Sequence, residues 1–107
     1  MTHEIPRGSA AIIDVLNERT RQKEVEGWTL EHDDKHVDSS LALAAVCYAI
    51  PDEVRRYVRN VNSIVPSDWP RSWRACWWKP KDRRRDLVRA AALLIAEIER
   101  LDRAEAE

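Results

Sequence analysis

The residue types best suited to chemistry gather in one short stretch of the chain, residues 26–38. Gly27 and Trp28 open it, and a dense polar cluster follows: Glu31, His32, Asp33, Asp34, His36 and Asp38. An aromatic ring beside a glycine hinge, followed by acids and imidazoles, is typical of a ligand pocket. The ring supplies apolar contact, and a few polar groups orient the ligand. We therefore predict ligand-binding roles for Trp28, His32, Asp33 and Asp34.

Two other interpretations of the acid and imidazole cluster stay open. His32 and His36 stand four residues apart, so on a helix they would share one face and could hold a metal ion. The spacing matches no closed zinc site, however, and no thiol is nearby, so we assign neither a metal nor a cofactor. The other interpretation is a solvated turn whose aspartates cap the next helix.

Tryptophan is the next notable residue type, with five copies in a chain that has no phenylalanine. Trp73 and Trp77 are four residues apart and would lie on one helical face, which favours a role as core filler. Trp28 and Trp78 instead stand in loop sequence, with Trp78 close to cationic residues. Two such rings can sandwich a purine, at about 1–3 kcal/mol per stacked base. We count Trp77 and Trp78 among the predicted ligand-binding residues.

A basic run follows Trp78 and carries six cationic side chains: Lys79, Lys81, Arg83, Arg84, Arg85 and Arg89. A charge run is usually a solvated face, but positive charge at the start of a helix opposes the helix dipole. A bound anion would relieve that opposition, as would Asp82 and Asp86. Arginine and lysine both bind phosphate, and we predict phosphate contacts for Lys79, Arg83 and Arg84.

Composition excludes several broad classes of function. The chain has 107 residues with a net charge of −1, which gives no global reason to bind nucleic acid or a membrane surface. The apolar run 41–50 is too short for a bilayer, which needs about 20 residues. Residues 2–8 are short and polar, so no signal peptide is expected. Cys47 and Cys76 fit no metal spacing. A reducing cytoplasm, in a bacterial host, is the expected location.

The expected fold class is all-α or nearly so: a compact bundle of three to four helices around a central apolar helix, with a Trp/Pro-rich loop. Residues 1–8 form a flexible N-terminal arm, and residues 9–107 a single helical domain. Ser9 caps a first helix at residues 10–26, whose expected buried side is Ile12, Ile13, Leu16 and Thr20. Gly27 ends that helix.

The second helix begins near residues 38–40, and its segment 41–50 is apolar all round, so we place it at the centre of the bundle. Pro51 starts a short third helix. Three prolines and four tryptophans mark the loop 62–80, and loops of this length are often functional. Asp82 caps the last helix, which extends to about Arg103. The all-apolar second helix also favours a homodimer, because one chain would not cover it.

Part of the chain resembles the ryanodine-receptor (RyR) domain. The likeness rests on the segment 21–28, which ends in Gly27-Trp28, on Asp33-Asp34-Lys35-His36, and on Lys79-Pro80-Lys81-Asp82 before the last helix. The sequence departs from that pattern at Thr29-Leu30 and at Val37, and residues 41–78 have no counterpart. The resemblance implies binding of adenine nucleotides through aromatic stacking.

The chain as a whole is similar to small proteins encoded by phages and prophages. The similarity rests on the segments Gly-Trp-Thr, Glu-His-Asp-Asp, Trp-Trp-Lys-Pro and Arg-Arg-Asp-Leu-Val. Phages encode small proteins that sequester nucleotide second messengers of bacterial defence. Together the two resemblances imply a non-enzymatic protein that captures a small nucleotide, of ADP-ribose type or cyclic, as an anti-defence sponge.

Two other classes of function remain as alternatives. One is a magnesium-dependent nucleotide pyrophosphohydrolase resembling the MazG family, which needs carboxylates at helical spacing to bind the cation. Segment 41–50 carries no carboxylate, so such a site would have to be assembled from Glu18, Asp33, Asp34, Asp86 and Glu97. The other is a phage regulator that binds a protein through a tryptophan-rich surface.

Overall fold

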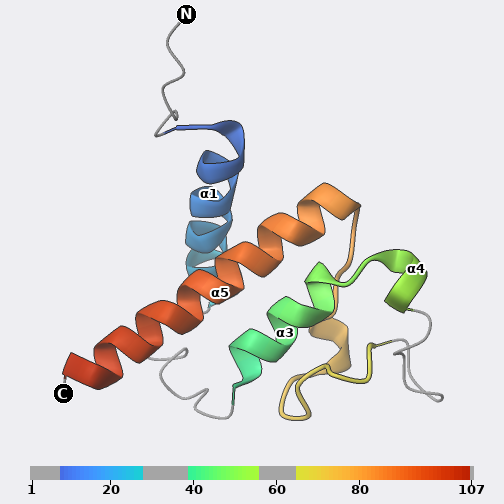
Figure 1. Cartoon of the computed structure of the whole chain (residues 1–107). Coiled ribbons are helices and arrows are strands. Elements are labelled where there is room, and N and C mark those ends of the chain that lie inside the picture. The colour runs from blue at the N-terminus through green and yellow to red at the C-terminus, as the bar shows by residue number, and fades with distance from the viewer. Residues whose placement is uncertain (1–7, 28–38, 56–64, 107) are drawn as a thin grey trace, which may run out of the picture.

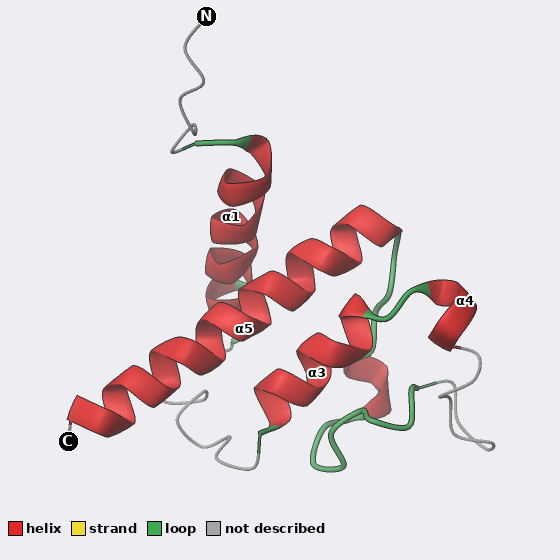
Figure 2. Ribbon diagram, viewed as in Figure 1, coloured by secondary structure: helices red, strands yellow, loops and turns green. Residues whose placement is uncertain are grey.

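The computed structural model describes residues 8–27, 39–55 and 65–106. These residues form four helices and one 3-10 turn and contain no strand, which confirms the predicted all-α class (Figures 1 and 2). The elements are α1 (Ala10–Glu24), α3 (Ser40–Ala49), α4 (Asp52–Arg55), the 3-10 turn η1 (Ala75–Trp77) and α5 (Arg83–Ala106). None of the helices in the described ranges is long and apolar enough to cross a membrane.

Helix α3 is the apolar centre that the sequence predicts. Leu41, Ala44 and Cys47 have no exposed surface, because α5 packs along the helix and the loop 65–80 covers it further. Its alanines let α5 approach closely, and α5 contributes small residues and Leu93 to the same cluster. Figure 1 shows α5 running alongside α3 and crossing α1.

The buried side of α1 differs from the prediction. Ile12, Ile13 and Leu16 are exposed, as is Thr20, whereas the buried residues of this helix are Glu18, Arg19 and Gln22. The physical reason is that the second half of α1 packs against α5 through paired charges, which periodicity of apolar residues does not reveal. The helix also ends at Glu24, two residues earlier than expected.

Local capping signals were predicted correctly at both long helices. The Ser9 hydroxyl accepts a hydrogen bond from the Ile12 N–H at 3.2 Å, and the Asp82 carboxylate accepts one from the Arg85 N–H at 2.8 Å. Each satisfies a backbone donor that the first turn of a helix leaves without an intrahelical acceptor. Gly27 has a φ of 75° just beyond α1, the left-handed conformation that favours glycine where a helix stops.

Glu18 joins α1 to α5 through a buried ion-pair network. Its carboxylate accepts two hydrogen bonds from Arg21, at 2.7 and 2.8 Å, one from Gln22 at 3.1 Å, and one from Arg85 of α5. Burial alone would raise the pKa of Glu18, but the hydrogen bonds and charges of Arg21 and Arg85 outweigh it and hold the pKa below the ordinary value of 4.5.

Arg55 joins α4 to α3 and α5. Its guanidinium donates to the Asp86 carboxylate at 3.1 Å and to the carbonyls of Cys47 and Tyr48 at 3.2 and 2.8 Å. Those carbonyls belong to the last turn of α3, where backbone acceptors lack intrahelical partners. Asp86 also accepts a hydrogen bond from the Lys81 N–H at 2.8 Å, so the start of α5 and the end of α3 are fixed together.

We predict that Glu18→Gln lowers the free energy of unfolding by about 3 kcal/mol at neutral pH, because it leaves Arg21 and Arg85 without a buried counter-charge. Urea denaturation followed by circular dichroism measures this. Glu24→Gln, on the exposed side of the same helix, is the control and leaves stability unchanged.

The difference in free energy of unfolding between the wild type and Glu18→Gln depends on pH in a defined direction. Because the folded pKa of Glu18 lies below its unfolded value of 4.5, its contribution is complete above about pH 4.5 and is lost as the pH falls through the folded pKa. The difference between the wild type and Glu18→Gln therefore narrows on acidification. A difference that widened below pH 4.5 would contradict the assignment.

Candidate functional site

The predicted ligand-binding residues divide into two groups. Trp28, His32, Asp33 and Asp34 lie outside the described residues, as does His36 of the alternative metal site. Trp77, Trp78, Lys79, Arg83 and Arg84 are described and can be placed.

The tryptophans of residues 69–78 form one aromatic cluster around Tyr48 of α3. The ring of Trp78 lies 4.7 Å from that of Tyr48 and 5.3 Å from that of Trp69, and the Arg55 guanidinium stands 5.0 Å from its centre. Trp73 packs edge-on against both Trp69 and Trp77, at 5.5 and 5.6 Å.

This cluster belongs to the core. Trp69 and Trp73 are 6% and 5% exposed, which confirms the core-filler interpretation for Trp73, and Trp77 and Trp78 are half-buried against it. The Tyr48 hydroxyl donates to the Trp77 carbonyl at 3.2 Å and accepts from the Lys79 N–H at 3.0 Å. Burial raises the pKa of Tyr48, so the hydroxyl keeps its proton for this role.

The basic residues after Trp78 have partners within the chain. Lys79 lies 3.6 Å from the Glu26 carboxylate, Arg84 lies 2.8 Å from that of Asp14, and Arg83 donates to the Ala49 carbonyl at 2.6 Å. Ion pairs as exposed as the first two contribute little, typically 0–1 kcal/mol each. The contact with Ala49 places Arg83 at the C-terminal end of α3.

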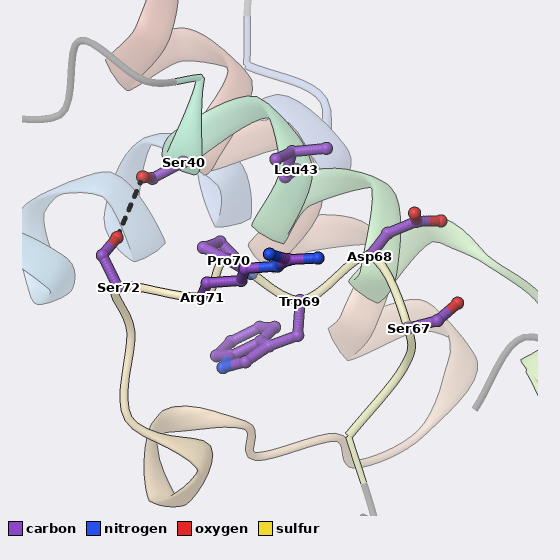
Figure 3. Close-up of a pocket in the computed structure, with 8 residues that line it drawn as sticks. All are labelled: Ser40, Leu43, Ser67, Asp68, Trp69, Pro70, Arg71 and Ser72. Atoms are coloured by element: carbon purple, nitrogen blue, oxygen red, sulfur yellow. Dashed lines mark hydrogen bonds between the residues drawn. The ribbon is translucent and has the colours of Figure 1, made fainter. Parts of the chain in front are cut away.

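A pocket of about 480 Å³ lies at the other end of α3, between its first turns and the loop 67–72 (Figure 3). This volume is within the range of small-molecule sites, about 300–1,000 Å³. Hydroxyl, carboxylate and guanidinium groups line it together with apolar surface. The lining residues are Ser40, Leu43, Ser67, Asp68, Trp69, Pro70, Arg71 and Ser72.

Two successive turns of identical pattern build the loop side of this pocket. In Pro66-Ser67-Asp68-Trp69 the Trp69 N–H donates to the Pro66 carbonyl at 3.0 Å, and in Pro70-Arg71-Ser72-Trp73 the Trp73 N–H donates to the Pro70 carbonyl at 3.1 Å. Each tryptophan is buried in the aromatic cluster, while the two residues between proline and tryptophan are exposed. The repeated Pro-x-x-Trp pattern thus directs polar side chains outward at a fixed spacing.

The helix side of the pocket is the N-terminus of α3. Ser39, the N-cap residue, has a left-handed backbone (φ 67°), and its side chain makes no capping hydrogen bond. The first N–H groups of α3 therefore lack a side-chain acceptor from the N-cap, and they carry the positive end of the helix dipole. Ser40, the first helical residue, has its hydroxyl 3.5 Å from that of Ser72 across the pocket (Figure 3).

Arg71 and Asp68 give the pocket one charge of each sign. In Figure 3 the Arg71 side chain lies between Trp69 and Leu43, with its guanidinium extended toward Asp68. Arg71 forms neither a hydrogen bond nor an ion pair with the described part of the chain. A pocket that contains both a guanidinium in this state and a helix N-terminus suits an anionic group, and the carboxylate and the exposed serines suit ligand hydroxyls.

The sequence did not predict this pocket, although loops as long as residues 62–80 are often functional. The signal was present in the two consecutive Pro-x-x-Trp units. The exposed residues between proline and tryptophan in each unit line the pocket.

The carboxylates proposed for a magnesium site are not gathered in the described structure. Glu18 is held by Arg21 and Arg85, Asp86 by Arg55, and Glu97 lies 2.5 Å from Arg100. Across residues 8–27, 39–55 and 65–106, no group of three or more His, Cys, Asp or Glu side chains is placed to hold a metal ion. Asp33 and Asp34 lie outside those ranges.

A second cavity is lined by Glu18, Gln22, Tyr48, Trp77 and Arg89, among others, and has a volume of only about 10 Å³. That is room for about one water molecule, so the cavity does not compete with the pocket at α3 as a site for an organic ligand.

Comparisons of the chain with protein-family models, with curated proteins and with solved structures find no match in any of the three. A functional assignment therefore has to rest on the geometry of the site, because a helical fold class alone does not determine an activity.

The two thiols differ in a way that can be measured. Cys47 has no exposed surface, and burial, together with the nearby charge of Asp68, raises its pKa to about 12. Cys76 is exposed. We predict that an aromatic disulfide reagent at neutral pH modifies only Cys76 in the folded protein, since the thiolate is the reactive form. Cys76→Ser abolishes the reaction and Cys47→Ser does not. Rapid modification of Cys47 in the native state would show that α3 is not covered as described.

Proposed function

We propose that this chain binds a small nucleotide, of ADP-ribose type or cyclic, without altering it chemically. One observation carries the proposal: a pocket of about 480 Å³ at the N-terminus of α3, where the guanidinium of Arg71 lies without an ion-pair partner in the described structure. Phosphate is a ligand for which helix N-termini and arginines are both suited.

The remaining groups of the pocket match the rest of a nucleotide. The Asp68 carboxylate accepts hydrogen bonds from ribose hydroxyls, and the hydroxyl of the exposed Ser72 donates or accepts as the ligand requires. Leu43 and the edge of Trp69 offer apolar contact. A single carboxylate facing a single arginine also disfavours a highly charged anion, which argues for one or two phosphate groups rather than a triphosphate.

The segment 28–38 directly precedes α3 in the chain, the helix whose N-terminus forms one side of the pocket. Asp34 precedes Ser40 by six residues, so even a fully extended chain keeps it within about 20 Å of the pocket. We assign base stacking to Trp28 and hydrogen bonding to His32, Asp33 and Asp34. Lys79, Arg83 and Arg84 remain a second basic surface: Arg83 lies at the C-terminal end of α3, which is about 15 Å long.

The biological role that fits such binding is sequestration. A protein that holds a nucleotide messenger without hydrolysing it lowers the free concentration of that messenger. The resemblances to phage proteins and to the RyR domain support this role, and the arginine-paired state of Glu18, Asp86 and Glu97 favours binding over magnesium-dependent hydrolysis.

We expect Arg71→Ala to weaken binding of ADP-ribose or of the cyclic nucleotide that binds best by at least about tenfold, the loss of a charge-assisted hydrogen bond in a partly desolvated site. Isothermal titration across a nucleotide panel measures this. Arg74→Ala is the matched control, because Arg74 is exposed on the same loop but does not line the pocket. Equal nucleotide affinities of the two variants would show that the pocket is not the binding site. No heat of binding for any nucleotide of the panel would show that the protein does not bind nucleotides.

Product analysis distinguishes hydrolysis of the nucleotide from binding without chemical change. Nucleoside triphosphates or ADP-ribose incubated with the protein and magnesium are expected to be recovered intact by ion-exchange chromatography. Release of a monophosphate with pyrophosphate from a triphosphate, or of AMP with ribose 5-phosphate from ADP-ribose, at a rate that depends on Asp33 or Asp86, would replace sequestration by hydrolysis.

A further inference from the structure

Helix α5 has a second apolar face that nothing in the described structure covers. Four large aliphatic side chains on it remain substantially exposed: Leu87 at 41%, Leu94 at 47%, Ile98 at 57% and Leu101 at 52%. They are not the side chains that pack on α3, which are Leu93 and the alanines at 90 and 96. Exposed aliphatic residues are normal singly, but an aligned row of them marks an interaction surface.

The spacing of this row is that of a coiled-coil seam. Leu87, Ala91, Leu94, Ile98 and Leu101 are separated by four, three, four and three residues, the alternation of d and a positions in a heptad repeat. The five positions span about 21 Å of helix. A strict d–a–d–a–d stripe is the pattern of a helix that pairs with another helix, in contrast to the wider face that packs into a globular core.

Helix α1 extends the seam along one side. A groove of about 230 Å³ lies between the two helices, lined by Ala11, Ile12, Val15 and Leu16 of α1 and by Ile95 of α5. Ile12 and Leu16 are 42% and 55% exposed. Ile95 stands four residues after Ala91 and three before Ile98 of the seam, so it borders both on the helix surface and the apolar surface is continuous across both helices.

The uneven distribution of charge along α5 indicates which partner fits this face. Residues 83–89 hold four arginines and one aspartate, whereas residues 97–106 hold four carboxylates and two arginines. The heptad continues at both ends of the apolar row into a positions occupied by Arg84 and Glu105. A parallel, in-register pair would set Arg84 against Arg84 and Glu105 against Glu105. An antiparallel pair instead brings the basic first turns of each helix to the acidic last turns of the other.

We propose that a second copy of this chain docks on this face, with the two α5 helices antiparallel along Leu87, Ala91, Leu94, Ile98 and Leu101. A seam that is apolar in the middle and opposite in charge at its ends is self-complementary under a two-fold axis, as an isologous dimer requires. The interface lies on α5 and α1 and leaves the α3 pocket outside it, so dimerisation and nucleotide binding are separate properties.

Sedimentation equilibrium of the full chain over the micromolar range tests the proposal. The wild type is expected to sediment as a dimer, and Leu94→Glu or Ile98→Glu to raise the dissociation constant by on the order of 100-fold or more, because each buries like carboxylates at the seam. Both side chains are exposed in the single chain, so the variants keep their helical circular dichroism. Val46→Glu, at a position 45% exposed on α3, is the control and stays dimeric.

Reversal of one charge tests whether the two α5 helices are antiparallel. Glu105→Lys is expected to weaken an antiparallel dimer, because the new cation meets the basic first turns of the second copy. In a parallel dimer it would exchange one like-charge pair for another and leave the dissociation constant unchanged, which would overturn the arrangement. A wild type that is monomeric throughout, or seam variants that remain dimeric, would overturn the interface itself. Binding of the nucleotide panel to Leu94→Glu separates this outcome from a failure of the proposed function.

Discussion

Two adjacent side chains near the start of α5 connect the helices of this protein. Arg85 reaches the buried carboxylate of Glu18 on α1, and Asp86 receives Arg55 of α4, whose guanidinium also holds the last carbonyls of α3. Buried ion pairs add little net stability, because desolvation offsets their attraction, but removal of one partner is costly. Their effect here is positional: each helix has one register on α5 in which all of these groups are satisfied.

This polar attachment explains why so much aliphatic surface is left over. Because α1 is fixed to α5 through Glu18 and Arg85, its apolar residues in the first half are not needed for that contact and stay exposed. Helix α5 likewise uses small residues and Leu93 toward α3, so its larger aliphatic residues face outward. Because the internal joint is polar and the outer face apolar, a second copy of the chain would cover the outer face without disturbing the fold.

Local features of the fold could be predicted from the sequence, and long-range choices could not. The helices, the caps at Ser9 and Asp82 and the central position of α3 follow from signals within a few residues. Helical periodicity shows that α1 and α5 have apolar stripes, but it does not tell which stripe faces inward. Glu18 resembled a solvated residue because its partner Arg85 is 67 positions away. The pocket at α3 could not be predicted for a similar reason: Arg71 and Ser40 line one pocket only in the folded chain.

The tryptophans contribute to the candidate site by fixing the backbone of the loop that lines it. Trp69 and Trp73 each close a turn through the backbone and bury their rings in the cluster around Tyr48, and the Trp69 indole N–H donates to the Arg74 carbonyl at 3.2 Å. The residues between proline and tryptophan in each unit are therefore held outward before any ligand arrives. Proline restricts the backbone at the first position of each turn, so little further ordering of the loop is required on binding, and preorganisation of this kind raises affinity without adding contacts. The unusual tryptophan content thus acts through the positions of Asp68 and Arg71, whose side chains present the charges that a nucleotide would meet.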